Sequence, residues 1–267
     1  MDRLYDCCCG LDVHKQTVVA CLIRPTAEVG QTKTIRTFGT TTDELDALGE
    51  WLAEAGCAHV AMESTGVYWK PVYNRLEGRF PILVANAQHI KTMPGRKTDV
   101  KDCEWIADLL QHGLLTPSFI PSQGQRELRD LTRTRTTLID ERSRVVLRLQ
   151  KVLEDANIKL AGVASDIMGV SARAMLEALV AGTTDPALLA DLAKGKLREK
   201  RAQLEQALAG RMSEHHRLMI SSHLAHVDFL DEQVEQLNHA IAERLRPFEA
   251  ELTRLETIPG IGRRTAE

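Results

Sequence analysis

The spacing of apolar residues changes near residue 115. Before this point, short runs of β-branched and other apolar residues alternate with stretches whose apolar residues lie three or four positions apart. Beyond residue 122 the short runs disappear, and the three-to-four spacing dominates. Runs of the first kind predict strands, and the helical spacing predicts amphipathic helices. We therefore expect an α/β region followed by an all-helical region.

The first region carries the signals of five strands and three helices. Three strand-like runs in succession favour an antiparallel meander, and the later alternation of strand and helix favours parallel crossovers. The resulting order, β-β-β-α-β-α-β-α, is that of the RNase H-like fold. The predicted strands are 5–13, 17–23, 31–40, 59–64 and 80–86, a loop is predicted at 88–98, and the helices begin after a cap at Thr42 or Asp43, near 67 with a bend at Pro71, and near 97.

The second region has two apolar stripes with coiled-coil spacing. They predict two long helices, separated by a segment at 157–195 whose glycines favour shorter helices. Arg135 and Arg142 occupy seam positions of the first helix, and we expect the part of the second stripe from 234 to 241 to hold subunits together. The stripes consist of Leu128, Leu131, Leu138, Val145, Leu149 and Val152, and then of Val227, Leu230, Val234, Leu237 and Ile241.

These patterns divide the chain into three parts. We expect an α/β domain at 1–115, a helical, coiled-coil arm at 116–250 and the start of a further domain at 251–267. In the last part, residues 259–262 (PGIG) suit a tight turn whose backbone N–H groups could approach a phosphate, and a frayed tail is the alternative. No run of 18 apolar residues is present, so the sequence predicts no membrane-spanning segment and no membrane partner.

The overall composition is ordinary for a soluble globular protein, with 43% hydrophobic residues, 27% charged residues and a net charge of -3. The charge is uneven, because residues 122–151 carry eight Lys/Arg against four Asp/Glu. A phosphate backbone could dock on such a segment, and the alternative is a soluble helix laced with pairs such as Asp130 with Arg133. The candidate contacts, which we expect to be scattered over more than one helix face, are Arg126, Arg129, Arg133, Arg144 and Arg148.

The six cysteines form no C-x-x-C pair, and the N-terminus shows no secretory signal. We therefore expect a reduced, cytoplasmic protein in which Cys7, Cys8 and Cys9 serve as small buried hydrophobic residues. Adjacent residues of a strand point to opposite faces, which disfavours the alternative that these three cysteines bind a metal.

Four carboxylates fall at the ends of predicted elements. Asp12 lies in the first strand, Glu63 ends the fourth, and Asp99 and Asp102 point the same way at the start of the last helix of the α/β region. In an RNase H-like sheet the first and fourth strands are neighbours, so the four side chains would converge. Clustered carboxylates repel unless a cation neutralises them, and they favour Mg²⁺ or Mn²⁺. The alternatives are local roles: a helix N-cap for Asp99, surface charge for Asp102, a turn cap for Asp12 and a pair with Lys70 for Glu63.

Several basic residues lie close to these carboxylates in the sequence. His14 and Lys15 follow Asp12 and are candidates for a phosphate contact or for a strand-end salt bridge. Residues 91–101 carry a net charge of +3, which favours a phosphate-facing loop, the alternative being a solvated loop. The candidate nucleic-acid contacts of this loop are Lys91, Arg96, Lys97 and Lys101.

Three motifs together resemble the DEDD transposases of bacterial insertion sequences, which are RuvC-like, serine-dependent recombinases guided by a bridge RNA. The motifs are "GLDVHK", "MESTGVYW" and "KTDVKDCEWIADLL", and they place the family tetrad on Asp12, Glu63, Asp99 and Asp102. The resemblance implies an RNase H-like (RuvC-like) domain, a tetrad that binds Mg²⁺, and DNA strand cleavage and exchange. It also implies a structured guide RNA as partner and a homo-oligomer, dimer or tetramer, joined through the coiled-coil arm.

The nucleophile of that family is a serine of its C-terminal domain, and no serine up to Glu267 matches its motif. We therefore expect a C-terminally truncated chain of the bacterial cytoplasm and nucleoid that binds DNA but cannot complete recombination alone. Two other functions stay open: a metal-dependent nuclease that uses water, and a catalytically incomplete nucleic-acid-binding fragment. An actin-like ATPase is disfavoured, because Val13, His14 and Lys15 stand where that family has Gly and Thr.

Overall fold

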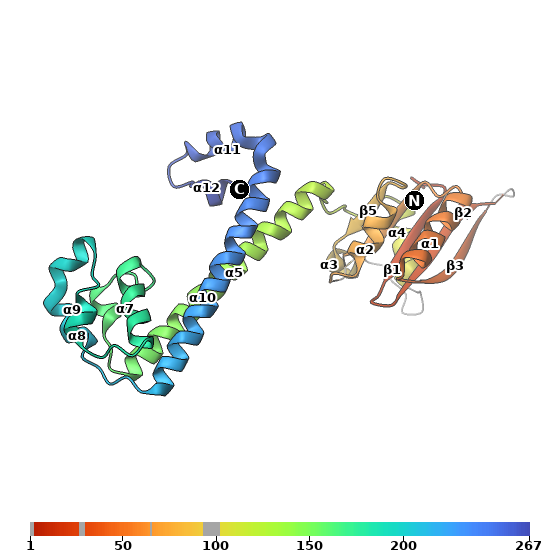
Figure 1. Cartoon of the computed structure of the whole chain (residues 1–267). Coiled ribbons are helices and arrows are strands. Elements are labelled where there is room, and N and C mark those ends of the chain that lie inside the picture. The colour runs from red at the N-terminus through yellow and green to blue at the C-terminus, as the bar shows by residue number, and fades with distance from the viewer. Residues whose placement is uncertain (1–2, 27–29, 65, 93–101) are drawn as a thin grey trace. The chain divides into compact units, whose positions relative to one another are not determined.

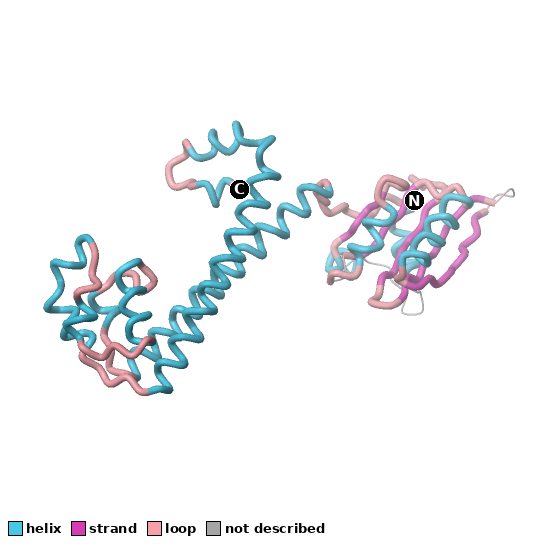
Figure 2. Tube along the Cα trace, in the orientation of Figure 1, coloured by secondary structure: helices cyan, strands magenta, loops and turns pink. Residues whose placement is uncertain are grey.

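The computed structural model describes residues 3–26, 30–64, 66–92 and 102–267. The chain forms two compact units, residues 1–121 and residues 122–267, which we name the sheet unit and the arm unit (Figure 1). The described strands all lie in the sheet unit, whereas the arm unit consists of helices and connecting loops (Figure 2). The change in apolar spacing along the sequence therefore coincides with the division of the structure.

The sheet unit is built on a five-stranded sheet with the order β3-β2-β1-β4-β5. β1 (Cys8–Val13), β2 (Thr17–Pro25) and β3 (Gln31–Gly39) form an antiparallel meander, and β4 (His59–Glu63) and β5 (Ile82–Ala85) continue the sheet in parallel on the other side of β1. The nearly continuous apolar runs of β1 and β2 are typical of strands that are covered on both faces. β1 thus lies at the centre, between an antiparallel and a parallel neighbour.

Helices cover both faces of this sheet. α1 (Thr42–Glu54) and α2 (Trp69–Leu76) pack on one face, where Leu48 is fully buried among strand residues. α4 (Asp102–Gln111) packs on the other face through residues such as Ile106. Each fully buried Leu or Ile stabilises the fold by about 2 kcal/mol, so the two clusters fix the helices on the sheet.

The predicted order of elements is confirmed, with differences at three helices. The N-cap of α1 is Thr41, one position before the first of the two predicted caps, Thr42 and Asp43. Pro71 lies in the first turn of α2, where its missing N–H breaks no helical hydrogen bond, so nothing there requires the predicted bend. α3 (Ala87–Thr92) occupies the start of the stretch that was predicted as a loop, and the remainder of that loop lies outside the described residues.

Two long helices, α5 (Gln123–Asp155) and α10 (Glu214–Leu245), run antiparallel and form the hairpin of the arm unit. Both were predicted from the apolar stripes. None of the helices described in the chain combines the length and the apolar character that crossing a membrane requires. The polar contacts along the hairpin, from its open end to the opposite end, are Glu127 with Arg244, Arg135 with Asn238, Arg142 with Asp231 and Asp155 with His216.

The apolar seam of the hairpin is closed within one chain. Ile241 is 1% exposed and packs in a cluster with Leu128 and Leu131 of α5, and Leu237 lies against the same cluster. Val234 is also buried. The expectation that the stripe from 234 to 241 holds subunits together is therefore corrected. Spacing shows that a helix has an apolar stripe, and here the partner that buries the stripe is another helix of the same chain.

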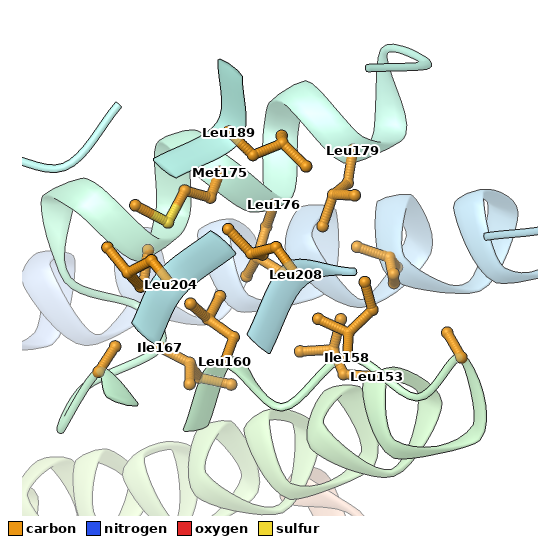
Figure 3. Close-up of a cluster of buried hydrophobic side chains, with 14 of the residues drawn as sticks. Leu153, Ile158, Leu160, Ile167, Met175, Leu176, Leu179, Leu189, Leu204 and Leu208 are labelled. Atoms are coloured by element: carbon orange, nitrogen blue, oxygen red, sulfur yellow. The ribbon is translucent and has the colours of Figure 1, made fainter. Parts of the chain in front are cut away.

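Residues 156–213, which connect the two long helices, form a small helical lobe that we call the head. Its core contains Leu160, Leu176 and Leu208, which lie close together between the short helices (Figure 3). Leu153 at the end of α5 joins this cluster, so the head is anchored on the hairpin. The short helices predicted for 157–195 are confirmed, and two more helical segments follow before α10. They are α6 (Leu160–Val163), α7 (Val170–Val180), α8 (Pro186–Ala190), the 3-10 helix η1 (Gly195–Lys200) and α9 (Arg201–Leu208).

The segment after α10 folds back onto the hairpin. The buried guanidinium of Arg135 donates to Glu267 over 2.6 Å and to Asn238 over 3.3 Å, which compensates a cation at a seam position. Gly260 has φ +89° in the turn before the last helix, a conformation that glycine adopts without strain. The elements of this segment are η2 (Arg246–Phe248), α11 (Glu249–Glu256) and α12 (Arg263–Ala266).

Candidate metal and nucleic-acid sites

Asp12 and Glu63 lie at the same end of the sheet and on the same face. In the parallel pairing of β1 with β4, Leu11 is opposite Met62, so the next residues along the two strands are Asp12 and Glu63. Side chains alternate between the faces of a strand. Leu11 and Met62 belong to the cluster under α1 and α2. Asp12 and Glu63 therefore project from the opposite face, which α4 covers.

A close approach at Gly10 fixes α4 against β1. A Cβ atom added to Gly10 would lie 2.3 Å from the carbonyl oxygen of Cys103 and 2.4 Å from the backbone nitrogen of Ala107. Both are backbone atoms that cannot move aside, so only glycine allows the helix to pack this closely. Asp102 is the first residue of α4. The contact therefore holds the start of α4, and with it Asp102, beside the strand that carries Asp12.

His14 is a hydrogen-bond partner of Asp12. Its Nε2 lies 3.1 Å from Oδ2 of the carboxylate, and since an ionised carboxylate only accepts hydrogen bonds, the ring nitrogen donates. The carboxylate is 24% exposed and the imidazole 57%. Of the two roles considered for His14, the strand-end pair is therefore the one observed. Lys15 is exposed, and its carbonyl accepts a hydrogen bond from Thr40 over 3.1 Å.

The donor set at this end of the sheet fits a hard divalent cation. Carboxylate oxygens are the ligands that Mg²⁺ and Mn²⁺ prefer, and Asp12, Glu63 and Asp102 come from three separate elements that meet here. Among the described residues, however, no three His, Cys, Asp or Glu side chains already form a metal-binding group. Asp99, the fourth carboxylate expected, lies outside the described residues.

The basic residues expected near the carboxylates cannot all be placed. Arg96, Lys97 and Lys101 lie outside the described residues, and of Lys91 only the backbone, in α3, is described. Their proposed contact with phosphates stays a prediction.

The arginines of α5 lie on one side of the helix. A continuous helix with 3.6 residues per turn places the five candidates within an arc of about 100°. The expected scatter over more than one face is therefore corrected. The arc points away from the seam, where Arg135 and Leu149 are buried, and four of the five side chains are exposed, Arg126 being partly buried. We call this set the arginine stripe: Arg126, Arg129, Arg133, Arg144 and Arg148.

A sheet of this order, with helices on both faces and carboxylates on β1, β4 and the helix that packs over them, defines an RNase H-like domain, here followed by a helical region. The family model of the IS110-type DEDD transposases, described as a transposase family, matches residues 9–158, more than half of the chain. The chain belongs to this family. No curated protein sequence matches it.

Two solved structures from Thermus thermophilus resemble part of the chain. RuvC in complex with a Holliday junction substrate is 12% identical, with 42% of this chain and 99% of that chain covered and a TM-score of 0.30. A second RuvC structure is 13% identical, with 43% of this chain and 85% of that chain covered and a TM-score of 0.27. The fold assignment rests on the sheet order and the family match rather than on these weak likenesses.

Proposed function

We propose that the chain is a transposase subunit whose carboxylates Asp12, Glu63, Asp99 and Asp102 hold Mg²⁺, or Mn²⁺ in its place, for DNA strand cleavage and exchange. The observation that carries this proposal is the parallel register of β1 and β4. It puts Asp12 beside Glu63 on the face covered by α4, whose first residue is Asp102.

The residues of the chain prepare this site in two ways. His14 donates to one oxygen of Asp12 and so orients the carboxylate. Gly10 lets α4 come close enough for Asp102 to share the site. The divalent cation would supply electrostatic stabilisation of the negative charge that develops on the phosphodiester oxygens. Like charges at this spacing are tolerated because the cation neutralises them.

The nucleic acid would be held by cations on both units. The arginine stripe presents its charges on one side of α5, and Lys15 follows the strand that carries Asp12. Lys91, Arg96, Lys97 and Lys101 would add contacts near the carboxylates. These contacts are to phosphates, so they give affinity and position without reading the base sequence.

The family resemblance supports two further partners, a structured guide RNA and further copies of the chain. Contacts between copies would use surfaces other than the seam of the hairpin, which the chain fills itself. The strand exchange of the family uses a serine nucleophile, and no serine of this chain is assigned that role.

Binding of Mn²⁺ tests the metal site directly. Bound Mn²⁺ is detected by the enhancement of water-proton relaxation. In Asp12→Asn and in Asp102→Asn the affinity for Mn²⁺ should fall at least about tenfold, because we expect the loss of one charged ligand to weaken binding by more than about 1.4 kcal/mol. Glu50→Gln is the matched control, since Glu50 is an exposed carboxylate of α1 on the other side of the sheet. Equal Mn²⁺ affinity in all variants would refute the site.

The form of the DNA product separates the proposed function from its alternatives. Free DNA ends made only with Mg²⁺ and lost in Asp12→Asn would indicate a nuclease that uses water. A covalent protein–DNA adduct would indicate a serine step within this chain. Metal binding and DNA binding with neither product would indicate a subunit that needs a nucleophile from elsewhere.

A further inference from the structure

The densest run of basic residues in the arm unit lies in the head, at 194–201 with the sequence KGKLREKR. Five of these eight residues are Lys or Arg and one is acidic. Arg201 is neutralised by two carboxylates within hydrogen-bond distance. Among the described residues, no carboxylate forms an ion pair with Lys194, Lys196 or Lys200, and all three are exposed. The head therefore has a concentration of uncompensated positive charge.

These three lysines line a cavity of about 590 Å³. The other lining residues are those of the segment 163–166, residues 169–172 at the start of α7, and Gly195 and Leu197. Parts of the chain about 30 residues apart therefore border one open depression. The volume is within the range of small-ligand sites. The positive charge is thus gathered around a concave surface instead of being spread over a convex one.

The walls of this cavity are tied to each other. The backbone N–H of Lys194 donates to the hydroxyl of Ser171 over 2.9 Å, and Nζ of Lys200 donates to the carbonyl of Val163 over 3.2 Å. Gly195, between two of the lysines, has φ +56°, which a residue with a side chain adopts only with strain. The lysines therefore start from a fixed backbone, and less ordering is needed when a ligand binds.

The start of α7 adds to the positive potential. Its N-cap residue Gly169 provides no side-chain cap, and the following Val170 is 72% exposed. The N–H groups of a first helical turn carry positive partial charge and suit an anion. The lining contains one carboxylate, that of Asp166, which accepts the N–H of Met168 over 2.9 Å. Three ammonium groups outweigh it, so the cavity favours an anion.

We propose that this cavity binds phosphate groups of a nucleic-acid backbone, as a second contact region of the arm unit besides the arginine stripe. The identity of the ligand rests on the proposed function; the preference for phosphate rests on the cavity itself. The ammonium groups exclude a metal cation. The three lysines that line the cavity are spread over residues 194–200, which suits a polyanion with several phosphates better than a single carboxylate.

Salt dependence of nucleic-acid binding tests the proposal in the full chain. The double variant Lys194→Gln and Lys196→Gln removes two charges and leaves the backbone hydrogen bond of residue 194 intact. Each lost phosphate contact on a duplex lowers the slope of log affinity against log salt by about 0.9, so the slope for a labelled duplex should fall by about 1.8. The matched control is Arg246→Gln with Arg254→Gln, an equal charge change at exposed residues outside the cavity.

A slope that falls in the lysine variant and not in the arginine control supports the cavity. An unchanged slope in the lysine variant, or an equal fall in both, would overturn it while leaving the proposed function intact. If the wild-type chain binds no nucleic acid, the proposed function fails. A titration with inorganic phosphate, followed by amide NMR, then tests whether the cavity binds phosphate. Shifts at Val170, Ser171 and Gly195 that disappear in the lysine variant support a phosphate site, and their absence in the wild type refutes it.

Discussion

The sheet unit and the arm unit arrange their candidate functional groups in opposite ways. In the sheet unit, the candidate carboxylates Asp12, Glu63 and Asp102 are far apart in sequence, and the strand register and the packing of α4 place the three elements that carry them side by side. In the arm unit, the arginine stripe lies along one helix and depends on no long-range pairing beyond that which supports the helix. A metal site built from convergent side chains loses its geometry when one supporting contact is lost. A line of charges loses affinity for a polyanion in steps, one charge at a time. Convergence suits chemistry at one point, and a line suits the binding of an extended polyanion.

The two units can be observed separately. All three tryptophans and all six cysteines lie in residues 1–121. Tryptophan fluorescence and thiol chemistry therefore report on the sheet unit alone, while most of the helical circular dichroism comes from the arm unit. The first three of the following predictions use this separation.

The largest effect is expected for thiol reactivity. Burial raises the pKa of Cys8, Cys21 and Cys57 to about 12. The reactive thiolate is then about a thousandfold scarcer at pH 8 than in the unfolded chain, so these thiols should react with Ellman's reagent that much more slowly. The half-buried Cys7 should react first. Rapid reaction of all six thiols without denaturant would contradict the packing of the sheet unit.

Truncation of Leu149 should destabilise the arm unit strongly. This side chain is fully buried where the hairpin meets the head, and Leu149→Ala should lower the free energy of unfolding of the arm unit by about 3 kcal/mol. Leu147→Ala is the matched control, because Leu147 is 57% exposed and should change stability by less than about 0.5 kcal/mol. Urea unfolding should show the loss by circular dichroism at 222 nm and leave the tryptophan transition in place. A shift of both transitions would show that the units unfold together.

Gly10→Ala should produce the converse pattern. The added Cβ overlaps backbone atoms of α4, which should lower the stability of the sheet unit by about 1–3 kcal/mol and move the tryptophan transition to lower urea. Gly124→Ala in α5 meets no atom within 4 Å and should stabilise its helix by less than about 1 kcal/mol. If Gly10→Ala unfolds at the wild-type urea concentration, α4 does not pack on β1 as described.

The smallest effect is expected at His223. Burial lowers its pKa, and the nearby Arg148 and His226 act in the same direction. Its folded pKa lies below the unfolded value, so its contribution to stability is complete above about pH 6.5 and is lost as the pH falls through the folded pKa. An NMR titration of the imidazole protons should give a midpoint below 6.5. Arg148→Gln should raise that midpoint, and Arg126→Gln, in the first turn of α5, should not.

The sequence predicts the elements of the sheet unit well because their signals are local. Short apolar runs identify β1 and β2, the second of them rich in β-branched residues, and the three motifs place the carboxylates at the ends of elements. The pairing of Asp12 with His14 was accessible too, since residues two apart on a strand share a face. Asp99 was predicted from its motif, but it lies outside the described residues, so its place in the site stays a prediction.

What the sequence does not predict depends on contacts between distant segments. The apolar stripe at 234–241 has the same spacing whether a second copy or α5 buries it, and only the fold of the chain selects α5. The cavity of the head joins residues 163–172 with 194–200, and no local pattern indicates that these segments meet. The arc of the arginine stripe, by contrast, follows from residue numbers alone once α5 is known to be continuous.

The continuity of α5 also sets a length scale for the nucleic acid that we propose it binds. At 1.5 Å per residue, the rise from Arg126 to Arg148 is about 33 Å. One turn of B-form DNA is about 34–36 Å, so a duplex lying along the helix would present the same strand, on the same side, to both ends of the stripe. The spacing between the two ends of the arginine stripe would then match one helical turn of the duplex. Seven residues added to α5 and to α10 at matched heights would preserve the seam but move the two ends apart by about 10 Å, roughly a third of a turn out of phase.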